Sequence, residues 1–403
     1  MLVLAVLLAA WMPGMAQKAL RTVKNYLKQD KPSEALNEIN RLRADSTSDV
    51  RFSPRLYHYA VEANIALNNV ENEKLYLHQA YDTAKFFTTT YDLFDNIIRC
   101  EQYEQQLLAQ KGKKFKYHKT HGTLMHSYYR NLGVAAHYYY RKANYAEAMK
   151  FLELFLEVPE LPIWGSDKSV TSSKLYLQNA FLYQRCAYRS KQYDRVGRYS
   201  AVTLRDSSRR RCGSLEYMAQ AAKAEGDSIA FLRYIRMGIE DYPQHPYFFA
   251  QLAGYYAQRQ AYRPLVLLAD SMLQLDSTNL RYMEAKVMAY LNLRQYDEAI
   301  RVAQAGLATD SMAAEMDYFI GLAYCNLASA VALPTNINTA AYRRASAERK
   351  AYYTAARPHL ERYRRLEPEK VSRWAPLLYH VYFALNEGEK FEEINKVLEK
   401  LFS

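Results

Sequence analysis

The stretch between Glu104 and Glu147 holds the side chains of this chain that are best able to bind an anion or a metal ion. It contains no acidic residue, and its lysines and arginines give it a local charge of +8. Such a density of cations attracts anionic partners. The cations are Lys111, Lys113, Lys114, Lys116, Lys119, Arg130, Arg141 and Lys142, and the histidines His118, His121, His126 and His137 lie among them.

Two of these histidines have a spacing that a metal ion can use. On a helix, His118 and His121 would share a face, and imidazoles placed in this way can bind zinc. Five lysines surround them, however, and no carboxylate or thiolate lies between Glu104 and Glu147 to complete a ligand set. We therefore expect no metal site and no cofactor.

The segment 113–119 also combines lysines with the rings of Phe115 and Tyr117. Lysines neutralise phosphates and aromatic rings stack on bases, so this pattern could serve a nucleic acid. An acidic protein, an anionic glycan or a membrane surface would meet the same charge. A plain solvated basic face would explain the segment without any partner, so its composition leaves these alternatives open.

Catalytic motifs are missing from the sequence. It has no His-Glu-x-x-His, no Gly-x-Ser-x-Gly, no phosphate-binding loop, no dinucleotide glycine pattern and no Cys-x-x-Cys. We therefore expect no catalytic residues, no cofactor-binding residues and no enzymatic activity. The four cysteines are widely separated, so we expect buried free thiols at Cys100, Cys186, Cys212 and Cys325.

The elements that position these side chains are expected to be helices. Only 13 glycines and 12 prolines occur in 403 residues, so few turns interrupt the chain. Many of the 37 tyrosines fall at helical spacing, where they can fill contacts between helices or line a binding surface. With 54 lysines and arginines against 42 acids, the net charge of +12 favours an anionic partner.

A repeat of 34 residues runs through 212–313. Tyr262 and Tyr296 lie 34 residues apart, and Ser228 occupies the same place one interval earlier. The three units close at the same interval, at Pro243, Ser277 and Ser311. This pattern resembles the tetratricopeptide repeat, a helix–turn–helix unit, here of an exported bacterial type. The resemblance is specific for about residues 129–330 and loose elsewhere.

The resemblance implies an all-α fold, a right-handed α-solenoid of stacked antiparallel helix pairs. It also implies a protein that binds other proteins. The expected parts are a signal peptide at 1–16, degenerate helical pairs at 17–112, basic Tyr-rich repeats at 113–210, three contiguous units at 211–313, a unit with an inserted segment at 314–370, and a capping pair at 371–403.

Several local features are predicted within these parts. The polar pair Asn68-Asn69 indicates a break between two helices. A further repeat unit is expected over about 177–210, with Tyr183, Ala187, Tyr193, Val196 and Leu204 at its repeat positions. Recurrent Asp-Ser pairs are expected to cap the helices that follow them. Small residues at the eighth place of a unit let its two helices approach closely, at Ala136, Ala219, Ala253 and Gly321.

The repeat register also implies a concave groove lined by the first helices. Eight matching positions point into it: Arg130, His137, Tyr140, Arg141, Arg185, Tyr188, Arg189 and Lys223. The family's clamp for peptide carboxylates uses Lys and Asn at slots that hold Gly133, Phe181 and Glu216 here, so that role is not expected. We predict a non-enzymatic scaffold whose basic groove binds an acidic protein or peptide. An anionic glycan or membrane surface remains an alternative, and nucleic acid is not the expected partner.

The start of the sequence predicts export. Residues 1–12 are apolar and uncharged, Pro13-Gly14 ends the run, and Gly14 and Ala16 are small, as a signal peptidase requires. No Lys or Arg precedes the run, which departs from the usual pattern. No Cys follows at a lipid-attachment position and the run is too short to span a bilayer, so we expect neither a lipoprotein nor a transmembrane segment.

We therefore place the mature protein in the periplasm or at the outer-membrane periphery of a Gram-negative-type bacterium. The alternative is an intracellular basic helical-repeat protein that binds nucleic acid or another anionic polymer. In that case the apolar start would be a structural helix.

Overall fold

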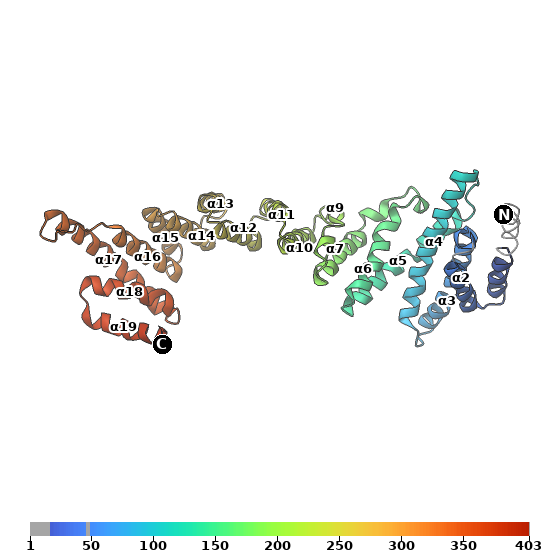
Figure 1. Ribbon diagram of the computed structural model, residues 1–403, viewed down its shortest axis with the longest axis horizontal. Helices are drawn as coiled ribbons and strands as arrows, with labels where there is room; N and C mark the ends of the chain where they lie inside the picture. Colours follow the sequence, from blue (N-terminus) through green and yellow to red (C-terminus); the bar gives the residue numbers. More distant parts are fainter. Residues whose placement is uncertain (1–16, 46–48, 403) are drawn as a thin grey trace, which may run out of the picture. The chain divides into compact units, whose positions relative to one another are not determined.

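The computed structural model describes residues 17–45 and 49–402, so the predicted signal peptide lies outside the described residues. Within these two ranges the chain is built of helices and contains no β-strand (Figure 1). The predicted fold class, an all-α solenoid of stacked antiparallel helix pairs, is confirmed. The chain divides into two compact units, residues 1–234 and residues 235–403, and the boundary falls inside α11 (Ser228–Asp241).

In the first unit, residues 17–28 are helical and pack against the helices that follow. These helices are α2 (Pro32–Ala44), α3 (Pro54–Tyr76), α4 (Thr83–Lys111), α5 (His118–Arg141), α6 (Tyr145–Glu157), α7 (Lys174–Arg189), α8 (Tyr193–Val196), α9 (Ser200–Thr203) and α10 (Arg209–Glu225). Short 3-10 turns lie at η1 (Asp49–Phe52), η2 (Val158–Glu160), η3 (Pro162–Trp164) and η4 (Ser169–Ser172).

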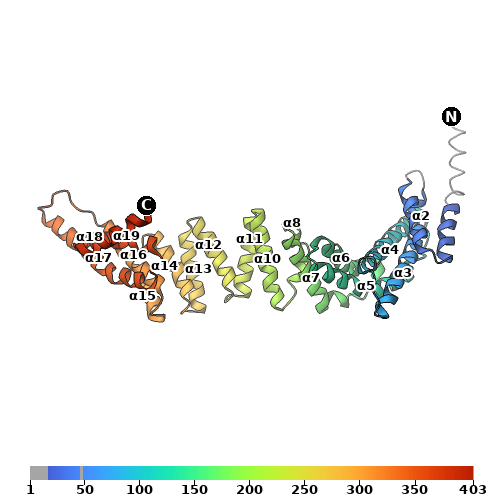
Figure 2. The same cartoon turned by 90° about the horizontal axis from the view of Figure 1, so that it is seen from below.

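The second unit continues from α11 with helix pairs of more regular length. Its helices are α12 (Pro246–Gln258), α13 (Tyr262–Leu275), α14 (Leu280–Asn292), α15 (Tyr296–Thr309), α16 (Ala314–Ala330), α17 (Ala340–Leu366), α18 (Val371–Leu385) and α19 (Gly388–Phe402). Within each unit, helices that follow one another in the chain lie side by side. Examples are α5, α6 and α7 in the first unit, and α16, α17 and α18 in the second (Figure 1, Figure 2).

The 34-residue period of the sequence appears in the backbone. The first helices start at Pro246, Leu280 and Ala314, and the second helices start at Ser228, Tyr262 and Tyr296. The turn within each pair has one residue in the left-handed region, with φ of 77° at Gly226, 55° at Gln260 and 58° at Arg294. These turn residues are again 34 apart. A left-handed residue after a helix lets the chain reverse direction while the last carbonyl groups of the helix keep hydrogen-bond partners.

The predicted break at Asn68-Asn69 is wrong, because α3 runs unbroken through both residues. Asn68 is 1% exposed, and its amide nitrogen lies 2.9 Å from the carbonyl oxygen of Phe86 on α4. The same nitrogen is 3.0 Å from the hydroxyl oxygens of Thr89 and Thr90. A buried asparagine with all these partners joins two helices, and the helices separate only after Tyr76.

In the unit predicted at about 177–210, the chain after α7 forms only two single turns of helix, α8 and α9, in place of a continuous second helix. The Asp-Ser pairs also act differently from the prediction. Asp206 accepts the backbone N–H of Ser208 at 2.8 Å, and Asp310 accepts that of Met312 at 2.8 Å. These bonds reach two residues ahead and shape the turn before the helix, so the aspartates are not themselves the N-caps.

The four cysteines are free and buried, as predicted. Burial raises the pKa of the Cys186 and Cys325 thiols to about 12. These thiols therefore stay protonated near neutral pH and serve as small apolar core residues.

The close approach of helices predicted at Gly321 is visible in the second unit. A Cβ atom added to Gly321 on α16 would lie 2.5 Å from the Cγ and Cδ2 atoms of Leu360 on α17, a side chain that is fully buried. By contrast, a Cβ atom added to Gly254 on α12 would meet nothing within 4 Å.

We predict opposite effects of one substitution at these two glycines. Gly321→Ala should destabilise the protein by about 1–3 kcal/mol, because Leu360 has no space to move into. Gly254→Ala should stabilise it by about 0.5–1 kcal/mol, because alanine loses less backbone entropy in a helix. Urea unfolding followed by circular dichroism measures both, and a Gly321→Ala variant as stable as Gly254→Ala would contradict the close packing.

Candidate functional site

The structure brings three of the eight predicted groove residues into direct contact. The guanidinium of Arg185 lies 5.1 Å from the ring centroid of Tyr140, and that of Arg189 lies 5.6 Å from it. Arg189 also donates to the hydroxyl of Tyr145 at 3.2 Å, and the rings of Tyr140 and Tyr145 are 5.7 Å apart. We call Tyr140, Tyr145, Arg185 and Arg189 the Tyr140–Arg189 cluster.

Local sequence explains how this cluster forms. Tyr140 lies in the last turn of α5 and Tyr145 begins α6, with Ala143 in the left-handed region at the turn between them. Arg185 and Arg189 are four residues apart on α7, so they project from the same face. Tyr145 was missed by the sequence reasoning because it starts a second helix, whereas the groove was assigned to first helices.

The other predicted groove residues have different surroundings. Tyr188 packs against Tyr217 of α10, with ring centroids 5.1 Å apart, and extends the aromatic surface to the next helix. His137 is exposed to solvent, but partial desolvation together with the nearby Arg141 lowers its pKa, so it adds no charge at neutral pH. Lys223 lies 6.0 Å from the ring centroid of Phe231, and Arg130 is exposed on α5. The binding role of all eight residues stays a prediction.

The basic segment before α5 is held in place by acids that lie outside it. Glu104 of α4 is 5% exposed and accepts the backbone N–H of Lys116 at 2.7 Å and that of Tyr117 at 3.2 Å. His118 Nδ1 lies 2.7 Å from an oxygen of Glu101, one turn away on α4. The segment is therefore not a freely solvated loop, because tertiary packing supplies the carboxylates that its own sequence lacks.

His118 and His121 turn to different partners, although they are three residues apart. His121 Nε2 lies 3.0 Å from Nδ1 of His58 on α3, and His121 is 1% exposed. The His58 ring stacks on Tyr117 with centroids 4.0 Å apart, and its Nε2 lies 3.4 Å from Glu62. His58 is 63 residues from His121 along the chain, so the sequence alone gives no sign that the two imidazoles are in contact.

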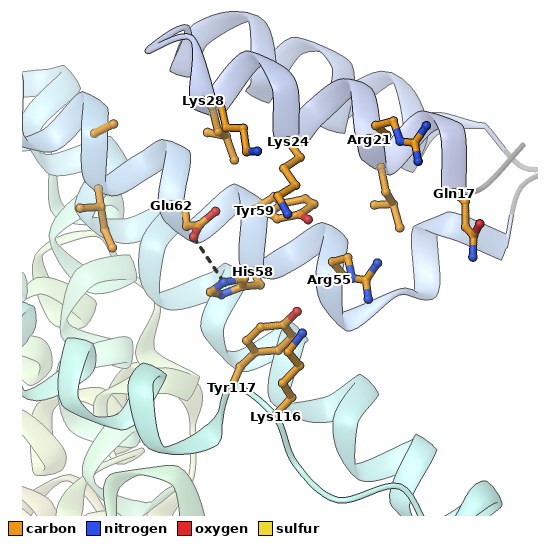
Figure 3. Close-up of a pocket in the computed structure, with 14 residues that line it drawn as sticks. Gln17, Arg21, Lys24, Lys28, Arg55, His58, Tyr59, Glu62, Lys116 and Tyr117 are labelled. Carbon is orange, nitrogen blue, oxygen red and sulfur yellow. Dashed lines mark ion pairs between the residues drawn. The ribbon is translucent and has the colours of Figure 1, made fainter.

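A pocket of about 880 Å³ opens beside this histidine pair (Figure 3). One wall is the helical segment 17–28, and the other is formed by α3 with residues 116 and 117. Its charged lining consists of Arg21, Lys24, Lys28, Arg55, Lys116 and a single acid, Glu62. Apolar and aromatic residues complete it, among them Leu20, Leu27, Tyr59 and Ile65. We call it the basic pocket. Of its lining residues, the sequence alone had pointed only to Lys116 and Tyr117.

The two walls of the basic pocket pack on one hydrophobic core. Val23 of the segment 17–28, Ile39 of α2 and Leu56 of α3 are fully buried in one cluster, which also includes Tyr117. Positions 21, 24 and 28 follow the helical period, so their cations lie on one face, next to the buried face of Val23.

The buried imidazole of His121 predicts a pH dependence of stability. Burial, with a smaller effect of His58, lowers the pKa of His121 to about 4 from an ordinary value of 6.5. The unfolded chain therefore binds the proton more tightly, so this stability is complete above pH 6.5 and is lost as the pH falls toward 4. Between pH 7.5 and pH 5 the loss should be about 2 kcal/mol.

His121→Gln should remove this part of the pH dependence, since glutamine can bond to His58 but does not titrate. Urea unfolding at pH 7.5 and pH 5 should show a smaller acid loss for this variant than for the wild type. His380→Gln, at an exposed position on α18, is the matched control and should keep the wild-type slope. Equal slopes for all three proteins would contradict a neutral buried His121.

Comparisons with known proteins give a fold likeness only. No family model and no curated protein sequence matches the chain. Among solved structures, a C-terminal part of a TPR repeat-containing protein from Cytophaga hutchinsonii is 13% identical, with a TM-score of 0.41, and covers 66% of this chain and 93% of that one. A MamA RS-1 ArsTM double mutant is 17% identical, with a TM-score of 0.34 and coverages of 47% and 97%. The TPR2AB domain of yeast Sti1 in a pHSP90 complex is 11% identical, with a TM-score of 0.24 and coverages of 69% and 99%.

The class of this protein follows from its own backbone. Helix starts and turn residues that recur every 34 residues make it a helical-repeat protein of the tetratricopeptide type. Across residues 17–45 and 49–402, no helix has the length and apolar character needed to cross a membrane.

Proposed function

We propose that this protein is a non-enzymatic scaffold of the bacterial cell envelope, which binds an acidic protein or peptide segment at the Tyr140–Arg189 cluster. One observation carries the proposal. In the described part of the chain, Arg185 and Arg189 rest on tyrosine rings and form no ion pair with a carboxylate. Nearby arginines are used differently, since Arg198 is paired with Glu153 and Glu157.

An acidic peptide fits the chemistry of the cluster. Guanidinium groups can bind a carboxylate through two parallel hydrogen bonds, and tyrosine rings hold them in position at little cost in entropy. The neighbouring contact between Tyr188 and Tyr217 adds aromatic area for the apolar part of such a segment. Tyrosine and arginine together are frequent anchors of protein interfaces.

We test the cluster together with Arg141, the predicted groove residue next to Tyr140, in the double variant Arg141→Glu with Arg189→Glu. Both residues are exposed, so the melting temperature should change little. Binding of an acidic peptide, such as a fluorescent Asp/Glu-rich peptide measured by anisotropy, should weaken at least about tenfold, or about 1.4 kcal/mol. Wild-type binding should also weaken as salt is added.

The matched control is Arg263→Glu with Lys350→Glu, which changes the net charge equally at exposed positions of the second unit. It should leave peptide binding within about twofold of the wild type, apart from the weak effect of overall charge. If both double variants lose the same amount of peptide affinity, the peptide is attracted by the overall positive charge and not by the cluster. A single-stranded oligonucleotide that binds more tightly than the peptide would favour the nucleic-acid alternative.

The envelope location rests on residues 1–16 and is tested separately. In the native cell, we expect the signal peptide to be removed after Ala16, so that the mature chain starts at Gln17. Mass spectrometry of the mature N-terminus checks this, and Ala16→Tyr should keep the precursor uncleaved. A chain from the native cell that still starts at Met1 would contradict the proposed envelope location. It would not affect the binding proposal.

A further inference from the structure

The basic pocket collects positive charge that no ion pair among the described residues neutralises. Within the described residues, Arg21, Lys24, Lys28 and Arg55 form no ion pair, and Lys116 faces only the ring of Tyr117, 5.2 Å away. The single lining acid, Glu62, lies beside His58. Five cations less one acid leave a net charge of +4 around the pocket. Like charges held this close repel one another, and a bound anion would relieve that repulsion.

We propose that the basic pocket binds a small organic anion that carries two or more phosphate groups. Each phosphate monoester carries about −1.5 to −2 charges at neutral pH, so two of them match the charge of the pocket. Arginine forks and lysine ammonium groups are the usual ligands of phosphate oxygens.

The shape of the pocket separates it from a solvated basic face. Figure 3 shows Arg21, Lys24 and Lys28 on one wall, and Arg55 and Lys116 on the other, with the pocket between them. A volume of about 880 Å³ lies within the range of small-molecule sites. Two opposed rows of cations can hold two phosphates at once, which a convex surface cannot do.

The rest of the lining gives room for an organic carrier. Leu20, Leu27 and Ile65 provide apolar surface, and Tyr59 provides an aromatic side chain. The lower wall is preorganised, since the buried carboxylate of Glu104 fixes the backbone of Lys116 and Tyr117 from behind. The backbone that carries Lys116 is therefore fixed before an anion binds, while the five cationic side chains of the pocket are exposed to solvent.

This site is separate from the Tyr140–Arg189 cluster, so it does not depend on the proposed function. The two phosphates have two possible sources, a soluble organic phosphate that carries both of them, or two adjacent phosphate-monoester headgroups of a lipid surface. Both present the same chemistry to the pocket, and the experiment distinguishes them.

The test uses the full chain and two double variants of equal charge change. Lys24→Glu with Arg55→Glu alters both walls of the pocket, and Lys111→Glu with Lys114→Glu alters exposed cations nearby that do not line it. Pyrophosphate binding is measured by calorimetry without Mg²⁺. We expect the wild type and the control variant to bind within about twofold of each other, and the pocket variant at least about tenfold more weakly.

Two further probes define the ligand. Citrate has a similar charge but carries carboxylates, and it should bind more weakly than pyrophosphate; equal affinities would overturn the choice of phosphate. Co-sedimentation with phosphatidylcholine vesicles, with and without phosphatidate, separates the sources. If the wild type and the control variant bind phosphatidate vesicles and the pocket variant does not, the ligand is a lipid headgroup. If the wild type binds pyrophosphate but not these vesicles, the ligand is a soluble phosphate.

Equal losses in both double variants would overturn the site in favour of diffuse electrostatics, as would a wild type that binds neither pyrophosphate nor phosphatidate. If the pocket variant does not fold, the wild type provides a second measurement. Saturating pyrophosphate should protect Lys24, Lys28 and Lys116 from acetylation, as read by mass spectrometry, while Lys111 and Lys114 react as before. Uniform reactivity of all five lysines would also overturn the proposal.

Discussion

The structure depends on one constraint, which is that a single helix pair has an apolar face on each side and can bury neither alone. Stacking of successive pairs removes both faces from water, so burial extends from pair to pair along each unit. In the second unit, Val287, Ile320 and Ala323 from α14 and α16 lie fully buried in one cluster. The contact of Gly321 with Leu360 shows how close this packing is, because not even a methyl group would fit.

The first unit adds buried polar groups to this plan. Asn68 joins α3 to α4, Glu104 joins α4 to the segment before α5, and the pair of His58 and His121 joins α3 to α5. Each polar group is desolvated by packing and compensated by a partner on another helix, so each bond fixes the position of one helix relative to the next. The bonds of Glu104 hold the backbone of Lys116 and Tyr117 in place, and the histidine pair positions His58; these three residues line the basic pocket.

Cations in the first unit have three kinds of surroundings, and these indicate their roles. Arg195 and Arg198 pair with Glu153, so they join neighbouring elements and are neutralised inside the fold. Arg185 and Arg189 rest on tyrosine rings, which orient them but leave their charge available. The cations of the basic pocket form no ion pair with any carboxylate in the described ranges 17–45 and 49–402. Net charge alone could not separate these groups, because all of them contribute equally to it.

Sequence by itself determined the helical class, the 34-residue period, the buried cysteines and the small residue at Gly321. These properties are local, since periodicity and residue size act along one helix or between neighbours in the chain. The same register assigned Tyr140, Arg185 and Arg189 to one groove, and the structure brings these three side chains into contact, while their binding role stays a prediction. Tertiary structure alone decided the rest. Asn68 looked like a turn residue because its partners lie on α4, and the acid-free stretch looked unpaired because Glu101 and Glu104 approach it from another helix. The basic pocket draws on residues 17–28, 55–66 and 116–117, which only packing brings together, since a charge many residues away along the chain can be the nearest one in space.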